Sequence, residues 1–199
     1  MLLLILTFPV GVKADVFNVL DHGAICNDIS DDWTAIQNLL NIVPASGALV
    51  RVPRGCAVSD TLIPKLNTRI CGDDWNNSHL RLTSTAFGKV LIKANTRTEI
   101  CHLHLVLNGN SQIGVLFEGT RETLFFRSWI SGLDKSETGI LVRSTADGIG
   151  SYDGNIELGQ FEALFRGVQI GDASRPNCTS NIWNVHKSRF SSNATGLFL

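Results

Sequence analysis

The sequence predicts an all-β fold of stacked coils, and three observations carry this prediction. Val, Ile and Leu recur in short runs, and Gly is plentiful at 18 residues, which favours strands joined by tight turns. A Gly followed by apolar residues recurs in the second half of the chain, at steps of 25, 28 and 29 residues. Its four copies begin at Gly114, Gly139, Gly167 and Gly196. Only one long segment has helical spacing, so helices do not alternate with the strands.

The composition narrows the class of protein. With 44% hydrophobic and 18% charged residues, the 199-residue chain is globular in composition and long enough for one substantial domain. The net charge is −1 and the basic residues are scattered, which argues against a nucleic-acid partner. No apolar run reaches the roughly 18 residues that a membrane span needs.

The N-terminus predicts export. Residues 1–14 contain a short apolar run from Leu2 to Phe8 and a small-residue site that ends at Ala14. This pattern resembles a secretory signal cleaved after Ala14, and the alternative is a mis-assigned start. We therefore expect a secreted or extracellular protein, with association with a virion as the alternative location.

The neighbouring acids Asp31 and Asp32 could form an acid–base pair or begin a helix. The apolar residues from Trp33 to Leu40 have the three- and four-residue spacing of one helix face. Ser30 or Asp31 is then expected as the N-cap, and the next carboxylate is expected in the first turn, where the helix dipole favours it. The helix should end at the breaker cluster 44–47, so both acids have a structural explanation.

Four segments around this helix resemble the N-terminal signature of the pectate lyase-like superfamily. They are Val16–Ala24, Ser30–Gln37, Gly47–Gly55 and Ile70–Asp73. The superfamily includes polygalacturonase-related hydrolases, polysaccharide lyases and phage tailspike depolymerases. The resemblance implies a right-handed parallel β-helix with an N-terminal capping α-helix. We expect the cap and first coil at residues 15–72 and incomplete coils at 73–199, truncated at the C-terminus.

A repeated pattern in the sequence also predicts the coils, independently of the resemblance to the superfamily. Upstream of each repeated Gly we expect a second strand, with apolar residues five positions apart. The pairs are Ile100 and Leu105, Leu124 and Trp129, Ile156 and Phe161, and Val185 and Phe190. The pattern predicts two strands per coil, and an Asn ladder typical of leucine-rich repeats is missing.

Five cysteines without a CxxC motif argue against a zinc ribbon or a thioredoxin-type site. Cys71 and Cys101 follow Ile in two similar strand-like runs. In a secreted protein they could form a disulfide, and separate buried thiols are the alternative.

Catalytic residues are weakly indicated. The Asn-Thr-Asp, Gly-His-Gly and Arg-Ile-Lys motifs of the polygalacturonase branch are absent, and the Asp73-Asp74 pair is expected in a solvated turn. The remaining candidates are acids expected in loops or at outward strand positions: Asp134, Glu137, Asp153 and Glu157. Coils spaced about 4.8 Å apart could bring two carboxyls to glycosidase distances, and a solvated surface charge is the alternative for each acid.

One outward row is unexpectedly apolar, with Leu116, Leu141 and Phe198 in equivalent positions. We expect a later loop or a partner subunit to cover it. Because tailspike relatives are trimers, the resemblance implies a homo-oligomer through this face.

The resemblance implies action on an acidic or complex extracellular polysaccharide, as a glycoside hydrolase or a polysaccharide lyase. The alternative is a non-catalytic carbohydrate-binding or structural β-helix, as in a phage tail or a surface adhesin. No cofactor is evident. Calcium enters only through the resemblance, because lyase relatives often use it, and the sequence contains no ligand set with calcium-like spacing.

Overall fold

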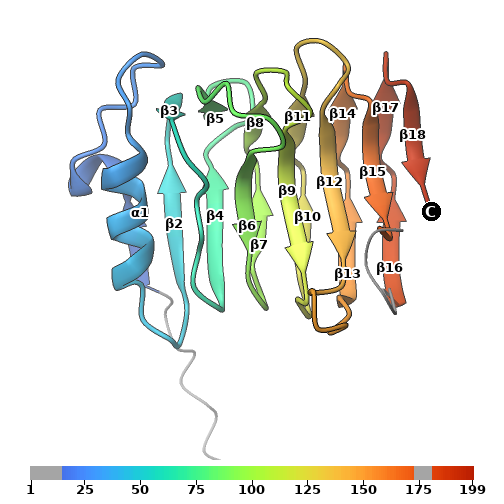
Figure 1. Cartoon of the computed structure of the whole chain (residues 1–199). Helices are drawn as coiled ribbons and strands as arrows, with labels where there is room; N and C mark the ends of the chain where they lie inside the picture. The colour runs from blue at the N-terminus through green and yellow to red at the C-terminus, as the bar shows by residue number, and fades with distance from the viewer. Residues whose placement is uncertain (1–14, 173–180) are drawn as a thin grey trace, which may run out of the picture.

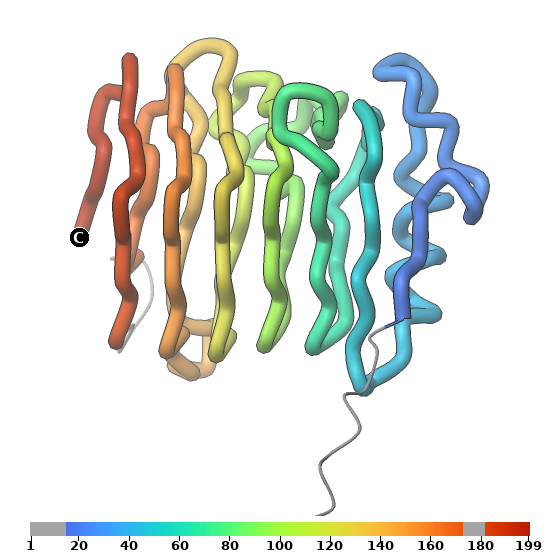
Figure 2. Tube along the Cα trace, turned by 180° about the vertical axis from the view of Figure 1, so that it is seen from behind, coloured from blue at the N-terminus to red at the C-terminus, as the bar shows by residue number. Residues whose placement is uncertain are grey.

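The computed structural model of the protein describes residues 15–172 and 181–199. It is an all-β parallel solenoid of about five turns with one short N-terminal helix (Figure 1). Each full coil gives one strand to each of three parallel sheets, and successive coils lie side by side, as the view from behind also shows (Figure 2). The prediction of a right-handed parallel β-helix with a capping helix is confirmed. The predicted leader, residues 1–14, lies outside the described residues.

The three sheets are called A, B and C. Sheet A contains β1 (Asp15–Asn18), β2 (Ala48–Val52), β4 (Thr68–Gly72), β7 (Glu99–Cys101), β10 (Leu124–Phe126), β13 (Tyr152–Glu157) and β16 (Asn181–His186). Sheet B contains β3 (Cys56–Val58), β5 (His79–Leu82), β8 (His104–Val106), β11 (Trp129–Ser131), β14 (Gln160–Glu162) and β17 (Arg189–Ser191). Sheet C contains β6 (Val90–Ala94), β9 (Ile113–Glu118), β12 (Thr138–Arg143), β15 (Arg166–Ile170) and β18 (Thr195–Phe198).

The paired acids begin the helix α1 (Trp33–Ile42), which follows the short 3₁₀ helix η1 (Val19–His22). Asp31 accepts the Trp33 N–H at 3.1 Å, and the buried Asp32 accepts the N–H of Ile25 at 2.6 Å. The prediction of a helix start is therefore confirmed. The expected cap was wrong, because Asp32 is the boundary residue and the first turn of α1 contains no acid.

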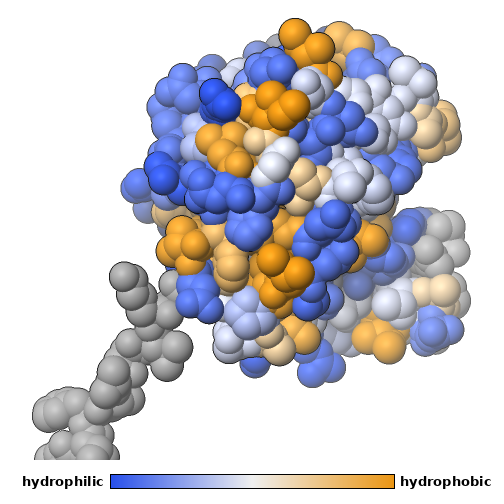
Figure 3. All heavy atoms as spheres, turned by 90° about the vertical axis from the view of Figure 1, so that its left-hand side faces the viewer, coloured by the Kyte–Doolittle hydropathy of each residue, from blue (hydrophilic) through white to orange (hydrophobic). Residues whose placement is uncertain are grey.

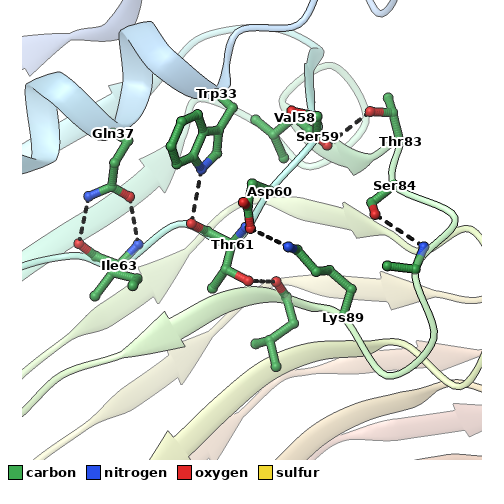
Figure 4. Close-up of polar contacts among 12 residues, drawn as sticks. Trp33, Gln37, Val58, Ser59, Asp60, Thr61, Ile63, Thr83, Ser84 and Lys89 are labelled. Carbon is green, nitrogen blue, oxygen red and sulfur yellow. Dashed lines mark hydrogen bonds and ion pairs between the residues drawn. The ribbon is translucent and has the colours of Figure 1, made fainter.

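The helix α1 is held on the first coil through the segment 59–63 (Figure 4). The Trp33 indole N–H donates to the Thr61 carbonyl at 3.0 Å, and the Gln37 amide bonds both the N–H and the carbonyl of Ile63. Lys89, which belongs to the next coil, forms an ion pair with Asp60 at a distance of 2.5 Å. Seen end-on, this capped end mixes polar and apolar side chains (Figure 3).

The expected second strand of each coil is two strands that meet at a corner. A residue and the fifth residue after it point to opposite faces of one strand, so both face the core only if the chain turns between them. Ile100 in β7 and Leu105 in β8 are both fully buried, and His102 between them has a left-handed φ of 52°. The prediction of two strands per coil is therefore wrong, and the coils have three.

One expected inward pair was shifted by one residue. Phe125 pairs with Ile100 and Ile130 with Leu105, so these two residues face the core in place of Leu124 and Trp129. Both runs are continuously apolar, and their pattern alone does not show which residue is inward. Stacking on the neighbouring coil sets the register, and the rings of Phe125 and Phe161 lie 5.8 Å apart in the core.

The outward row on sheet C is less exposed than expected. Leu116 and Leu141 are only 3% and 6% exposed within the single chain, which overturns the expectation that they form an open apolar row. Phe198 is 42% exposed, and the Arg166 guanidinium lies 4.2 Å from its ring. An oligomer through this face stays a prediction, without an open apolar row to drive it.

Two disulfides join neighbouring coils. Cys71 and Cys101 occupy matched positions of β4 and β7 and are bonded, so of the two alternatives left open by the sequence the disulfide is the one found. Cys26 and Cys56 form a second bond that the sequence analysis missed, with the same separation of 30 residues. Disulfides form in oxidising compartments, so the two bonds favour an extracellular location. None of the helices in residues 15–172 and 181–199 has the length and apolar character of a membrane span.

Candidate functional site

A groove lies where sheets A and B meet. In later coils this corner takes only two residues, but between β4 and β5 it takes six, from Asp73 to Ser78. The longer loop is closed by the Asp74 carbonyl, which accepts the N–H groups of Asn77 and Ser78 at 3.0 and 2.7 Å. The Ser78 hydroxyl lies 2.9 Å from the Asp73 N–H, which donates to it. This loop forms one wall of the groove.

Gly72 lets this loop approach the next coil. A Cβ at Gly72 would lie 2.2 Å from the His102 carbonyl oxygen and 2.5 Å from the Ser78 Cβ. Both atoms are fixed, one by the backbone and one by a fully buried residue, so no side chain fits there. The glycine therefore sets how closely the loop lies to the corner.

The floor of the groove is the column of corner residues from successive coils. Arg127, Leu158 and Lys187 all have left-handed φ values, of 43°, 55° and 46°. The Arg127 N–H donates to the Glu157 carbonyl and the Leu158 N–H to the His186 carbonyl, each at 3.0 Å, so the column follows the stacking of the coils. Arg127 and Lys187 are exposed at this corner, so their side chains point out of the coil.

The groove has a volume of about 590 Å³, which is within the range of sites that bind small ligands. Its lining combines acidic, basic and apolar groups. The lining residues are Asp73, Asp74, Trp75, His102, Arg127, Leu158, Gly159, Gln160, Lys187 and Arg189. The arrangement can hold an elongated polar molecule against an indole ring, with basic groups at the end farther from the cap.

The acids and bases of the groove differ in their pairing. Arg51 holds Asp73 through two contacts, Nε–Oδ1 at 2.5 Å and Nη2–Oδ2 at 2.7 Å, and this hydrogen bonding lowers the pKa of Asp73. Within the described part of the chain, Arg127, Lys187 and Arg189 form no ion pair. Much of the other basic charge is paired, in Arg69–Glu99, Lys89–Asp60, Lys93–Glu118, Arg97–Glu122 and Arg143–Glu118. The groove therefore has basic groups without an acidic partner among the residues described, and the Arg127 guanidinium lies 5.2 Å from the centre of the Phe126 ring.

A smaller recess of about 310 Å³ lies beside the groove, on the outer face of sheet A. Glu157 at the end of β13 and His186 at the end of β16 are matched residues of neighbouring strands, and both line it. Lys187 lines both the recess and the groove, so the two are neighbours at this residue. A carboxylate, an imidazole and an ammonium group thus face one open space.

The other predicted catalytic acids lie elsewhere. Asp134 and Glu137 are in the loop between β11 and β12, and Asp153 is exposed in β13. Glu137 is fully buried, and its carboxylate accepts the N–H groups of Gly109 and Ser136 at 2.9 and 3.0 Å. That carboxylate holds the loop in place. Of the four candidates, Glu157 alone lines the recess, and a catalytic role for each stays a prediction.

The sequence reasoning missed most of the groove. Asp73 and Asp74 were interpreted as a solvated turn. At the corner positions of two coils, the polar residues His102 and Lys187 break the apolar pattern of the repeat. That break was the available signal, since a polar residue in an apolar repeat marks a side chain that points out of the coil.

A row of rings continues along the outer face of sheet B. His104 and Trp129 stack with ring centroids 3.8 Å apart, and His104 Nε2 lies 2.8 Å from the Ser131 hydroxyl. Burial, with the nearby charges of His79 and Arg81, lowers the pKa of His104 to about 4. His104 is therefore neutral at physiological pH.

Two groups of side chains among the described residues are close enough to hold a metal ion. They are Cys26, Asp32 and Cys56, and Cys71, Glu99 and Cys101. In each group both sulfurs are in a disulfide, so neither offers a thiolate ligand. The calcium expectation stays a prediction.

No protein-family model and no curated protein matches the chain. Solved structures match it in fold. The catalytic domain of Agl-KA has a TM-score of 0.76 at 19% identity, over 93% of this chain and 34% of that one. The Streptococcus pneumoniae surface protein and adhesin PfbA has a TM-score of 0.62 at 13% identity, over 87% of this chain and 61% of that one. An iota-carrageenase complexed to iota-carrageenan fragments has a TM-score of 0.56 at 20% identity, over 80% of this chain and 41% of that one.

The chain thus spans about a third of the Agl-KA domain and less than two thirds of PfbA and of the carrageenase. At these identities the likeness concerns the fold. Polysaccharide-active proteins and surface proteins share it, so it does not separate catalysis from adhesion. The chain has a right-handed parallel β-helix fold, which it shares with these solved structures.

Proposed function

We propose that this β-helix acts on an extracellular polysaccharide that lies in the corner groove. The observation that carries the proposal is the groove of about 590 Å³, with the Trp75 indole on one wall and basic groups from two coils on its floor. An indole offers a flat apolar face to the C–H groups of a sugar ring, and polar side chains such as Gln160 can bond its hydroxyls. The likeness to an iota-carrageenase bound to carrageenan fragments supports the same class of ligand.

Cleavage of the bound chain is the first form of this function, and the recess favours it. Glu157 and His186 are groups that can take and give protons, and they lie side by side at the edge of the groove. Elimination next to a uronate needs a base and a neutralised carboxylate, and the neighbouring Lys187 and Arg127 suit the second requirement. Hydrolysis would need a second carboxyl about 5–10 Å from Glu157.

Binding without cleavage is the second form. It is favoured by the wide spread of the predicted acids, since Asp134 and Glu137 lie in the β11–β12 loop and Glu157 lies at the end of β13. A non-catalytic protein of this kind would function as an adhesin does, and the likeness in fold to the adhesin PfbA is compatible with this role.

The test is a panel of acidic and neutral polysaccharides offered to the purified protein, with binding followed by affinity electrophoresis. We expect retardation by at least one glycan, and about tenfold weaker retardation of the Trp75→Ala variant. Phe87→Ala is the matched control, because Phe87 is 83% exposed and outside the groove. Equal effects of the two substitutions, or no retardation by any glycan, would contradict the proposal.

The same panel separates the two forms. New reducing ends together with absorbance from unsaturated uronates indicate a lyase, and reducing ends alone indicate a hydrolase. We expect Glu157→Gln and His186→Asn to abolish either signal, while Glu162→Gln on sheet B retains it. Binding without either signal would establish the non-catalytic form.

A further inference from the structure

We infer that the corner groove selects a glycan that carries negative charge, and that Arg127, Lys187 and Arg189 hold its carboxylate or sulfate groups. The inference rests on the proposed function, because it names the class of polysaccharide that the same groove takes. Three observations of the groove carry it.

The first observation is that the basic charge of the groove has no acidic partner in the part of the chain that the structure describes. The three basic side chains are exposed and have no acidic partner among the described residues, although the chain as a whole has a net charge of −1. Basic side chains that line one groove create a positive potential there, which favours an anionic ligand. A neutral sugar would leave this charge without a counter-charge.

The second observation is the pairing on the acidic wall. The charge of Asp73 is compensated by Arg51 from outside the groove, and Asp74 accepts the side-chain and backbone N–H groups of Asn76. These acids therefore do not reach across to neutralise the floor. The groove keeps separate ends, with the indole and the acids toward the cap and the basic groups toward the last coils.

The third observation is the regular spacing of the floor. Arg127 and Lys187 belong to one corner column, with Leu158 between them, so they are two strand spacings apart, roughly 10 Å. Arg189 lies two residues after Lys187, at the start of β17. A chain lying along the axis of the solenoid would meet basic groups at intervals, with an apolar step between them. Arginine also presents paired N–H donors that match a carboxylate or a sulfate.

The experiment compares charged glycans with neutral counterparts of the same backbone. Titrations would use oligosaccharides of iota-carrageenan and of its desulfated form, and polygalacturonate and its methyl ester, each at two salt concentrations. We expect the charged member of at least one pair to bind at least about tenfold more tightly at low salt, with the difference shrinking as salt rises.

Matched variants locate the effect. Arg127→Gln, Lys187→Gln and Arg189→Gln should each weaken binding of the charged glycan by about three- to tenfold and leave binding of the neutral one unchanged. Lys135→Gln is the control, because Lys135 is an exposed basic residue in the β11–β12 loop, outside the groove. All four positions are exposed, and thermal unfolding would verify that each variant is folded.

The outcomes distinguish this inference from the proposed function. Equal affinity for charged and neutral glycans would overturn the inference and leave the proposed function standing. An equal loss in Lys135→Gln would also overturn it, because it would show general polyanion attraction. If no glycan of either charge binds, both fail.

Discussion

Arg51 and Asp73 form a two-pronged ion pair that fastens the wall of the corner groove to the outer face of β2. The side chains are 48% and 41% exposed, so the pair adds little to global stability. Its effect is local, because it fixes the loop that carries Trp75.

Arg51→Gln should therefore loosen the wall without unfolding the protein. We expect no measurable change in the free energy of unfolding and about threefold weaker glycan binding. Arg97→Gln breaks a pair of similar exposure, Arg97–Glu122, away from the groove, and it should leave binding unchanged. Equal binding by the two variants would show that the pair does not position the wall.

Gly72→Ala should be costly, because the new methyl group would overlap the His102 carbonyl and the Ser78 Cβ. We expect a loss of about 2–4 kcal/mol in unfolding free energy, measured by urea denaturation. Gly88→Ala is the comparison. Gly88 has a φ of +65° and nothing near its Cβ position, so only backbone strain of about 1–2 kcal/mol applies. A smaller loss at Gly72 than at Gly88 would contradict the close approach.

The disulfide between Cys71 and Cys101 should stabilise the coils next to the groove. It closes a loop of 30 residues, and its removal by the double substitution to Ala should cost about 2–4 kcal/mol. The measurement is the thermal midpoint of the variant against that of the native protein, both without reductant. An unchanged midpoint would mean that the strand pairing alone holds these coils.

His104 should make the protein less stable as the pH falls from about 6.5 to about 4. Its folded pKa of about 4 lies below the ordinary value of about 6.5, so in this range the unfolded chain binds more protons than the folded one. Above pH 6.5 the effect is absent. Urea unfolding at pH 7 and pH 5 should show a smaller difference in His104→Gln than in the native protein. The same difference in both would assign the pH dependence to other groups.

The sequence predicted the solenoid because its repeat is a property of local pattern. Each inward residue stacks on the same position of the next coil, as Ile100 does on Phe125. The same apolar pattern therefore recurs in every coil and is visible in the sequence. The pattern failed where two neighbouring residues are both apolar. Leu124 and Phe125 fit an inward position equally well in the sequence, and only pairing with the adjacent coils distinguishes them.

The second disulfide shows what the coil length could have revealed. Cys26 and Cys56 are separated by 30 residues, as Cys71 and Cys101 are, and this is about one early coil. In the sequence, only Cys71 and Cys101 both lie in recognisable strands. Cys26 lies in an irregular loop, whose path depends on tertiary contacts that include the hydrogen bond from the Cys26 N–H to Asp32.

The candidate site was the least predictable part. Arg127, Lys187 and Asp74 come together from three coils, and their sequence separations of tens of residues carry no spacing signal. Their convergence follows from the corner geometry. Glu157 was predicted as an outward acid, and the structure adds the partner His186 from the next coil.

The most direct test of the account is hydroxyl-radical footprinting of the protein with and without a glycan found to bind in the panel. The account predicts protection of Trp75, Leu158 and His186, which line the groove and its recess, and unchanged reactivity of Phe87 and Leu133 in exposed loops. Protection confined to Phe87 and Leu133, with Trp75 still fully reactive, would place the glycan elsewhere and contradict the central claim.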